Sequence, residues 1–147
     1  MKSEPEEFSI DDLQRRPRQT EPWNDVRNFQ ARNLLRDVMR KGDLAFFYHS
    51  SCAEPGIAGI MTIASNAYPD STAFDPGTRY YDPKSKAHTP TWYLVDVKFE
   101  RKLNRPIPLS ELKAHKPLQK MQLLRPGNRL SVMPVTQQEW DYILKLE

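Results

Sequence analysis

The sequence has few of the residues that define several large classes of protein. Its single cysteine, Cys52, excludes an internal disulfide framework and a structural zinc site built on several thiolates. No apolar run approaches the roughly 18–20 residues needed to cross a membrane. Residues 1–7 contain no apolar signal region, and His88 and His115 lack metal-ligand spacing. We therefore expect a cytoplasmic protein with no membrane association, metal or cofactor.

Glycine is also scarce, with 5 glycines against 13 prolines among 147 residues. The apolar share of 38% is low, but six phenylalanines, six tyrosines and three tryptophans compensate because each buries a large area. This length fits one domain, residues 1–147. The prolines favour ordered connections between short strands over a helical bundle.

Positive charge is concentrated in one part of the chain. The net charge is only +3, yet residues 101–129 contain eight basic residues and one acidic residue, Glu111. Such a surface attracts phosphate backbones through salt-sensitive counterion release. Solvated loop charges are an equally good interpretation of this feature alone.

Three helices are indicated by local signals. Ser9 with Asp12, and Thr136 with Glu139, match capping boxes, and Pro17 limits the length of the first of these helices. Between them, residues 29–40 place apolar side chains at helical spacing, and Gly42 suggests the C-terminal end of that helix.

Strands are expected at residues 44–49, 57–63, 92–99 and 130–135. The first is a continuous apolar run, which predicts burial on both faces. These elements predict an α+β fold in which short helices pack around a small, partly open, mixed or antiparallel β-barrel. Residues 66–91 form a long irregular segment, which we interpret as a flap beside a pocket.

The residues that suggest a function lie at the ends of these elements. Trp23 stands in a polar stretch, and base stacking on an aromatic ring is worth about 1–3 kcal/mol. Core packing is the alternative for this side chain. Arg27 and Asn28 begin the second helix, where they suit a phosphate or a base edge, although Asn28 also suits a helix cap.

A second polar group closes the strand at residues 44–49. Ser50 and Ser51 can hydrogen-bond the exocyclic groups of a base, while strand alternation directs Tyr48 and His49 to opposite faces. His49 with Ser50 could form part of a catalytic site, but no third member of a triad is indicated.

Many of these segments resemble the EVE domain family, which is similar to the PUA and YTH folds. The resemblance is carried in chain order by Lys2-Ser3-Glu4-Pro5, Trp23 with Val26-Arg27-Asn28-Phe29-Gln30-Ala31-Arg32-Asn33, Phe47-Tyr48-His49-Ser50, Pro55-Gly56-Ile57-Ala58-Gly59, Ala67-Tyr68-Pro69-Asp70, Phe74-Asp75-Pro76, Tyr80-Tyr81-Asp82-Pro83-Lys84-Ser85-Lys86, Pro90-Thr91-Trp92-Tyr93 and Leu130-Ser131-Val132-Met133-Pro134-Val135.

Two departures from the family pattern stand out. The family usually begins with a full strand of the type Tyr-Trp-Leu-Met before Lys-Ser-Glu-Pro, and here only its end is present. The family also often has glycine after its Trp-Asp pair, where this chain has Asp25. Aspartate tolerates a positive φ better than most residues, so we expect the turn to survive.

The resemblance implies a single EVE domain with a PUA-like barrel that binds DNA or RNA carrying a modified base. Modified cytosine is the first ligand to consider. The expected base-binding residues are Ser3, Glu4, Trp23, Val26, Arg27, Asn28, Tyr48, His49, Ser50, Ser51, Tyr68 and Trp92. The expected contacts to the nucleic-acid backbone are Arg32, Lys84, Lys86, Arg125 and Arg129.

We expect this protein not to be an enzyme and to act as a monomer. Two alternatives use the same pocket. One is an enzyme that acts on a nucleotide, and the other is an interaction module for a small molecule or a protein.

Overall fold

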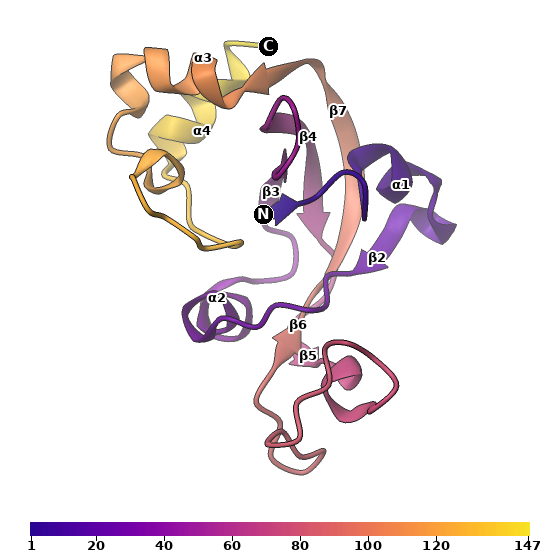
Figure 1. Ribbon diagram of the computed structural model, residues 1–147. Coiled ribbons are helices and arrows are strands. Elements are labelled where there is room, and N and C mark those ends of the chain that lie inside the picture. The colour runs from indigo at the N-terminus through magenta and orange to yellow at the C-terminus, as the bar shows by residue number, and fades with distance from the viewer.

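The computed structural model describes residues 1–147 and shows a curled five-stranded sheet surrounded by short helices (Figure 1). The strands are ordered β1-β3-β4-β7-β2. Their bounds are β1 (Lys2–Ser3), β3 (Leu44–His49), β4 (Gly56–Ile63), β7 (Asp96–Pro108) and β2 (Thr20–Pro22). The β1–β3 pair is parallel and the other pairs are antiparallel, which confirms a mixed, partly open half-barrel.

The long strand β7 gives the sheet its curl. It pairs with β4 over most of its length and with β2 near its start, and the β4–β7 register shifts twice. Such shifts bend a strand and increase its twist. The strand predicted at residues 92–99 is divided between β6 (Tyr93–Leu94), which pairs with β5 (Tyr68–Pro69), and the start of β7, which pairs with β2 and β4.

The two predicted capping boxes are both formed. Ser9 caps α1 (Ile10–Arg15) and Thr136 caps α4 (Gln137–Leu144). In each case the carboxylate at the third helical position accepts a hydrogen bond from the backbone N–H of the capping residue. Helix α1 ends before Pro17, as predicted, and η1 (Pro17–Gln19) follows it.

The helix predicted at residues 29–40 has two parts and ends early. Helix α2 (Phe29–Asn33) continues as a π-helical turn, η2 (Leu34–Val38), and the chain becomes extended at Met39. Gly42 does not end this helix, contrary to the prediction. Its φ of 97° belongs to the turn before β3, where its N–H donates to the carbonyl oxygen of Ile63.

Both faces of the central strands are covered (Figure 1). One core joins Phe47 and Met61 to α1, α2 and η2. The other joins Phe46 and Tyr48 to α3 (Leu109–Ala114), η4 (Lys116–Leu118) and α4. Strand alternation sends successive side chains of β3 to the two cores. Burial on both faces holds only for the centre of β3, because Leu44 is 55% exposed.

The prediction of a strand at residues 130–135 is wrong. Leu130 and Val132 are buried, yet no strand is formed there after η5 (Gln122–Leu124). One ladder-like hydrogen bond, from the N–H of Lys2 to the carbonyl oxygen of Ser131, joins this segment to β1. Pro134 has no N–H with which to extend the pairing.

Residues 66–91 include only two short elements, β5 (Tyr68–Pro69), which pairs with β6, and η3 (Ser71–Phe74). This segment lies at one end of the sheet, beyond β6 (Figure 1). Its Asp70 and Ser85 side chains are buried, so the predicted flap is held by packing and hydrogen bonds. None of the helices is long and apolar enough to span a membrane.

Candidate functional site

A polar cavity of about 620 Å³ opens beside the end of β1. Four segments form most of its walls: residues 2–8, residues 21–25 at the end of β2, residues 50–51 after β3, and residues 129–131. Arg16 and Tyr80 reach it from two further places in the chain. Its size falls within the ~300–1,000 Å³ range of small-ligand sites. The lining side chains are Lys2, Ser3, Glu4, Glu7, Phe8, Arg16, Glu21, Pro22, Trp23, Asn24, Asp25, Ser50, Ser51, Tyr80, Arg129 and Ser131.

Trp23 lines this cavity and also belongs to the core. It is only 8% exposed, and its ring meets the Phe47 ring edge-on at 5.4 Å between centroids. Its backbone N–H donates to the carbonyl oxygen of Val95, which fixes the chain after β2. Trp23 is therefore both a wall of the cavity and a core residue, which are the two interpretations that the sequence left open.

Serine hydroxyls form a second wall. Ser3 donates to the carbonyl oxygen of Phe8 at 2.6 Å and accepts at its own carbonyl from the N–H of Ser50. The hydroxyls of Ser50, Ser51 and Ser131 have no hydrogen-bond partner within the protein. Three hydroxyls therefore remain available to a ligand, and Ser131 is one that the sequence did not single out.

Two of the four carboxylates in the cavity are available to a ligand amino group. Glu7 is paired with Arg79, and Glu21 with Arg16. Glu4 is exposed and has no ion-pair partner. Asp25 accepts one hydrogen bond from Thr72 at 3.2 Å.

Asp25 adopts a φ of 70°, which confirms that the turn survives the replacement of glycine. Burial raises the pKa of its carboxyl group, and the charge of the neighbouring Asp70 raises it further. The hydrogen bond from Thr72 opposes this rise but does not cancel it. Apart from its departure from the family pattern, nothing about Asp25 in the sequence indicates that its side chain lies at the site.

Arg27 does not line the cavity. Its guanidinium donates to Asp70 at 3.1 Å, to the hydroxyl of Thr72 at 3.0 Å and to the carbonyl oxygen of Tyr80 at 3.0 Å. Asp70 also accepts from the N–H of Asp25 at 2.8 Å. This network ties the turn at residues 23–25 to the 66–91 segment, so Arg27 supports the cavity wall from behind.

Asp70 is the centre of that network and is fully buried. Burial raises the pKa of its carboxyl group, but hydrogen bonds from Thr72, the Asp25 N–H and Arg27 outweigh burial and leave the pKa below its ordinary value. The carboxylate is therefore held in its charged form as a fixed tether.

Several other predicted base contacts also lie outside the polar cavity. Val26 is a core residue, and Asn28 caps α2 by accepting from the N–H of Ala31. Tyr48 lies in the opposite core, and the Tyr68 hydroxyl donates to Asp96 at 2.5 Å. Trp92 is buried, where its Nε1–H donates to Asp82 at 2.7 Å.

His49 is engaged by the start of α1. Its Nε2 accepts a hydrogen bond from the N–H of Ile10 at 3.2 Å, and its ring meets Phe47 edge-on. Burial lowers the pKa of the His49 imidazole, which favours the neutral form that this acceptor role requires. Its Nε2 is therefore already occupied and is not free to take a proton from Ser50.

The predicted backbone contacts fall into two groups. Arg32 is held by the carbonyl oxygen of Thr91 and by Asn33, so its donors are largely used within the protein. Lys84 and Lys86 are exposed on the 66–91 segment. Arg125 and Arg129 are exposed and unpaired, and Arg129 borders the cavity directly.

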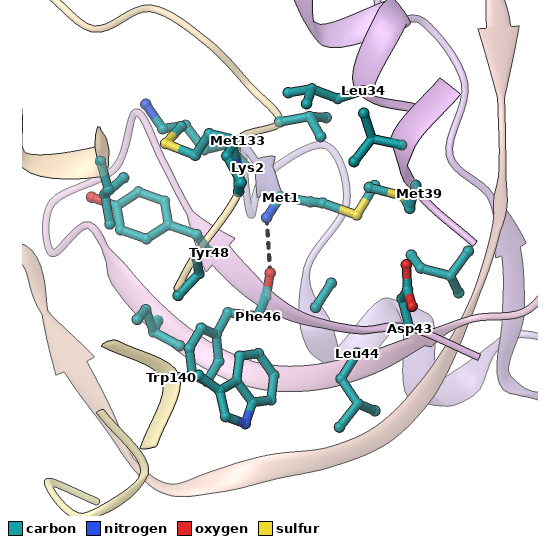
Figure 2. Close-up of a pocket in the computed structure, with 18 of the residues that line it drawn as sticks. Met1, Lys2, Leu34, Met39, Asp43, Leu44, Phe46, Tyr48, Met133 and Trp140 are labelled. Carbon is teal, nitrogen blue, oxygen red and sulfur yellow. Dashed lines mark hydrogen bonds between the residues drawn. The ribbon is translucent and has the colours of Figure 1, made fainter. Parts of the chain in front are cut away.

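A separate apolar groove of about 520 Å³, shown in Figure 2, also borders β1 through Lys2. Its floor includes Phe46, on which Trp140 stacks at 3.9 Å between centroids, and Met39 and Met133 face it. The amino group of Met1 donates to the carbonyl oxygen of Phe46 at 2.9 Å inside this groove. Few polar side chains reach into it, so it lacks the donors and acceptors that reading a base edge requires.

Comparison with known proteins gives consistent results. The sequence model described as EVE domain matches residues 1–146. Thymocyte nuclear protein 1 of Homo sapiens is 51% identical over 164 aligned residues, which cover 100% of this chain and 72% of the human protein.

Solved structures agree with this result. The crystal structure of human THYN1 protein in complex with 5-methylcytosine-containing DNA superposes with a TM-score of 0.94 and 51% identity, covering 99% of this chain and 94% of that chain. A crystal structure from Pseudomonas putida superposes with a TM-score of 0.94 and 48% identity, covering 99% and 96% of the two chains.

Proposed function

Because this chain belongs to the EVE domain family, we propose that it is a non-catalytic reader of modified cytosine in DNA. The observation that carries the proposal is the shared fold. A human relative that is 51% identical was solved in complex with DNA containing 5-methylcytosine. The polar cavity is the site that we assign to the base.

The edge chemistry of cytosine suits the free groups of the cavity. Its amino group donates, and carboxylates such as Glu4 and Asp25 accept from it. Its ring acceptors can receive hydrogen bonds from the hydroxyls of Ser50, Ser51 or Ser131. The rings of Phe8, Trp23 and Tyr80 supply aromatic surface along the lining.

Affinity must also come from outside the cavity. Extruding a paired base costs a few kcal/mol, whereas one methyl group in an apolar pocket is worth only about 1–3 kcal/mol. Arg129 at the cavity rim is placed to neutralise a phosphate, which adds a salt-dependent term. We therefore propose that base selectivity and backbone attraction act together.

The test is a titration of the protein with matched DNA and RNA oligonucleotides, each unmodified or carrying 5-methylcytosine, at two salt concentrations. We expect preferential binding to the modified DNA. Asp25→Asn and Glu4→Gln should each weaken that binding about 5- to 10-fold, because each replaces one accepting carboxyl oxygen with an NH₂ group that cannot accept. Glu54→Gln is the matched control, since Glu54 is exposed and lies outside the cavity.

Three results would contradict the proposal in distinct ways. Equal binding to modified and unmodified DNA would show that the basic surface binds phosphates and that the modified base is not recognised. A preference for modified RNA would show that the protein recognises RNA and not DNA. Turnover of a nucleotide substrate that is abolished by His49→Ala or Ser50→Ala would show an enzyme.

A further inference from the structure

A second, shallower hollow of about 390 Å³ adjoins the polar cavity. Arg129 lines both hollows, and Ser131 of the cavity wall follows two residues after it. The segment that forms this hollow descends from the α3 and α4 end of the molecule towards α2 (Figure 1). Its lining residues are Asn28, Gln30, Gln122, Arg125, Pro126, Gly127, Asn128, Arg129 and Leu130.

The hollow is framed by residues that hold each other in place. Asn128 donates to the carbonyl oxygen of Gln122 and to the sulfur of Met133, and its side-chain oxygen accepts from the N–H of Leu130. The backbone N–H of Asn128 donates to the carbonyl oxygen of Arg125, and Gly127 makes the turn with a φ of 76°. Asn128 therefore serves the loop itself and is not available to a ligand.

The other polar side chains of the hollow have unused hydrogen-bonding capacity. Gln30, Gln122, Arg125 and Arg129 form no side-chain hydrogen bond or ion pair within the protein, and the Nδ2 of Asn28 is also free. No acidic residue lines the hollow. The site therefore offers two guanidinium groups and two unengaged glutamine amides within one surface.

This arrangement differs from that of the other arginines. Nine of them, from Arg15 to Arg105, are held by side-chain hydrogen bonds or ion pairs within the protein. Only Arg18, Arg125 and Arg129 are not. Two of these three meet at the hollow beside the cavity, where they remain available to an external anion or base.

We propose that this hollow is a second nucleotide subsite, occupied by the nucleotide next to the base in the polar cavity. The inference rests on the proposed function. Arg129, which lines both hollows, contacts the phosphate that links the two nucleotides. Gln122, Arg125 and Gln30 meet the edge of the neighbouring base.

The side chains also indicate which neighbour is preferred. Arginine pairs best with the two acceptors of guanine, and glutamine with the donor and acceptor of adenine. None of the free groups is a carboxylate, the acceptor that suits the amino group of cytosine. The hollow therefore selects a purine beside the modified base, and a single good contact of this kind discriminates about 5- to 150-fold.

The test compares three ligands with the intact protein: free 5-methyl-2′-deoxycytidine, and oligonucleotides with 5-methylcytosine next to either a purine or a pyrimidine. The variants are Arg125→Ala and the double variant Gln30→Ala with Gln122→Ala. Arg18→Ala is the matched control because Arg18 is also unpaired but lines neither hollow. All of these changes leave the buried core intact.

We expect the wild-type protein and Arg18→Ala to prefer the purine neighbour at least fivefold. Arg125→Ala and the glutamine double variant should reduce that preference and weaken oligonucleotide binding, while the affinity for the free nucleoside stays unchanged.

Two outcomes separate this inference from the proposed function. If the wild-type protein prefers modified DNA but treats both neighbours alike, or if Arg125→Ala behaves as Arg18→Ala does, the second subsite is refuted and the base reader stands. If the wild-type protein does not distinguish modified from unmodified DNA at all, the proposed function fails and the subsite fails with it.

Discussion

Replacement of Asp70 by asparagine tests whether the wall of the polar cavity depends on one buried carboxylate. One oxygen of Asp70 accepts from the N–H of Asp25 and from Arg27, and the other accepts from the N–H and the hydroxyl of Thr72. An asparagine amide has the same shape but only one accepting oxygen. In either orientation, its NH₂ group would face two donors.

The expected loss of stability is about 3 kcal/mol. Breaking a buried ion pair by removing one partner costs about 3–5 kcal/mol because the other charge stays uncompensated. Here the Asp70 side chain is completely buried but that of Arg27 is 21% exposed, so water compensates part of the loss. Urea unfolding at pH 7 measures this change in the free energy of unfolding.

The effect should depend on pH in a defined direction. The pKa of Asp70 is below its ordinary value in the folded protein, so its stabilising contribution is present above the unfolded pKa near 3.8. That contribution is lost as the pH falls through the lower, folded pKa. The difference between wild type and Asp70→Asn should therefore shrink on acidification below pH 4.

A double-mutant cycle with Arg27→Met isolates the pair from the rest of the network. We expect a coupling free energy of about 2 kcal/mol and a weaker affinity of Asp70→Asn for modified DNA. A change of less than 1 kcal/mol at pH 7, or a difference that persists unchanged at low pH, would refute the assignment of Asp70 as the tether.

Three further predictions concern other parts of the molecule. Trp23→Ala should destabilise the protein by about 3–5 kcal/mol in thermal or urea unfolding, because Trp23 is a core residue, and an unchanged melting curve would contradict this. Asp25→Gly should retain the fold, since φ is 70° there, but lose affinity for modified DNA; loss of the fold would show a structural role instead. Burial lowers the pKa of the Met1 amino group to about 5, so the unfolded chain binds a proton that the folded chain does not between about pH 5 and 8. Stability should therefore rise with pH across this window, and acetylation of the amino group should abolish that part of the rise; an identical pH profile after acetylation would contradict the burial.

Local signals in the sequence were sufficient for much of the fold. The capping boxes at Ser9 and Thr136 depend on residues three positions apart, so both could be predicted. The same holds for β3, whose bounds match the predicted residues 44–49. The prediction of a strand at residues 130–135 was wrong because the apolar pattern there reflects burial of Leu130 and Val132. Strand pairing also needs a partner strand from a distant part of the chain, which the local pattern does not show.

The site was less predictable because its geometry depends on long-range contacts. Arg27 looked like a ligand contact, but Asp70, which is 43 residues away, holds it within the protein. Asn28 proved to be a helix cap, an alternative that the sequence had left open. Conversely, Phe8, Tyr80 and Ser131 reach the cavity from three separate segments, and nothing in their local sequence indicates that they meet.

The three tryptophans report on three different places, which makes the protein suited to site-resolved fluorescence. Trp23 lines the polar cavity, Trp140 stacks on Phe46 at the apolar groove, and Trp92 donates to a carboxylate in the 66–91 segment. A variant with Trp92→Phe and Trp140→Phe would retain a single emitter at the proposed base site. Quenching in that variant would follow occupancy of the cavity itself, free of signals from elsewhere on the surface.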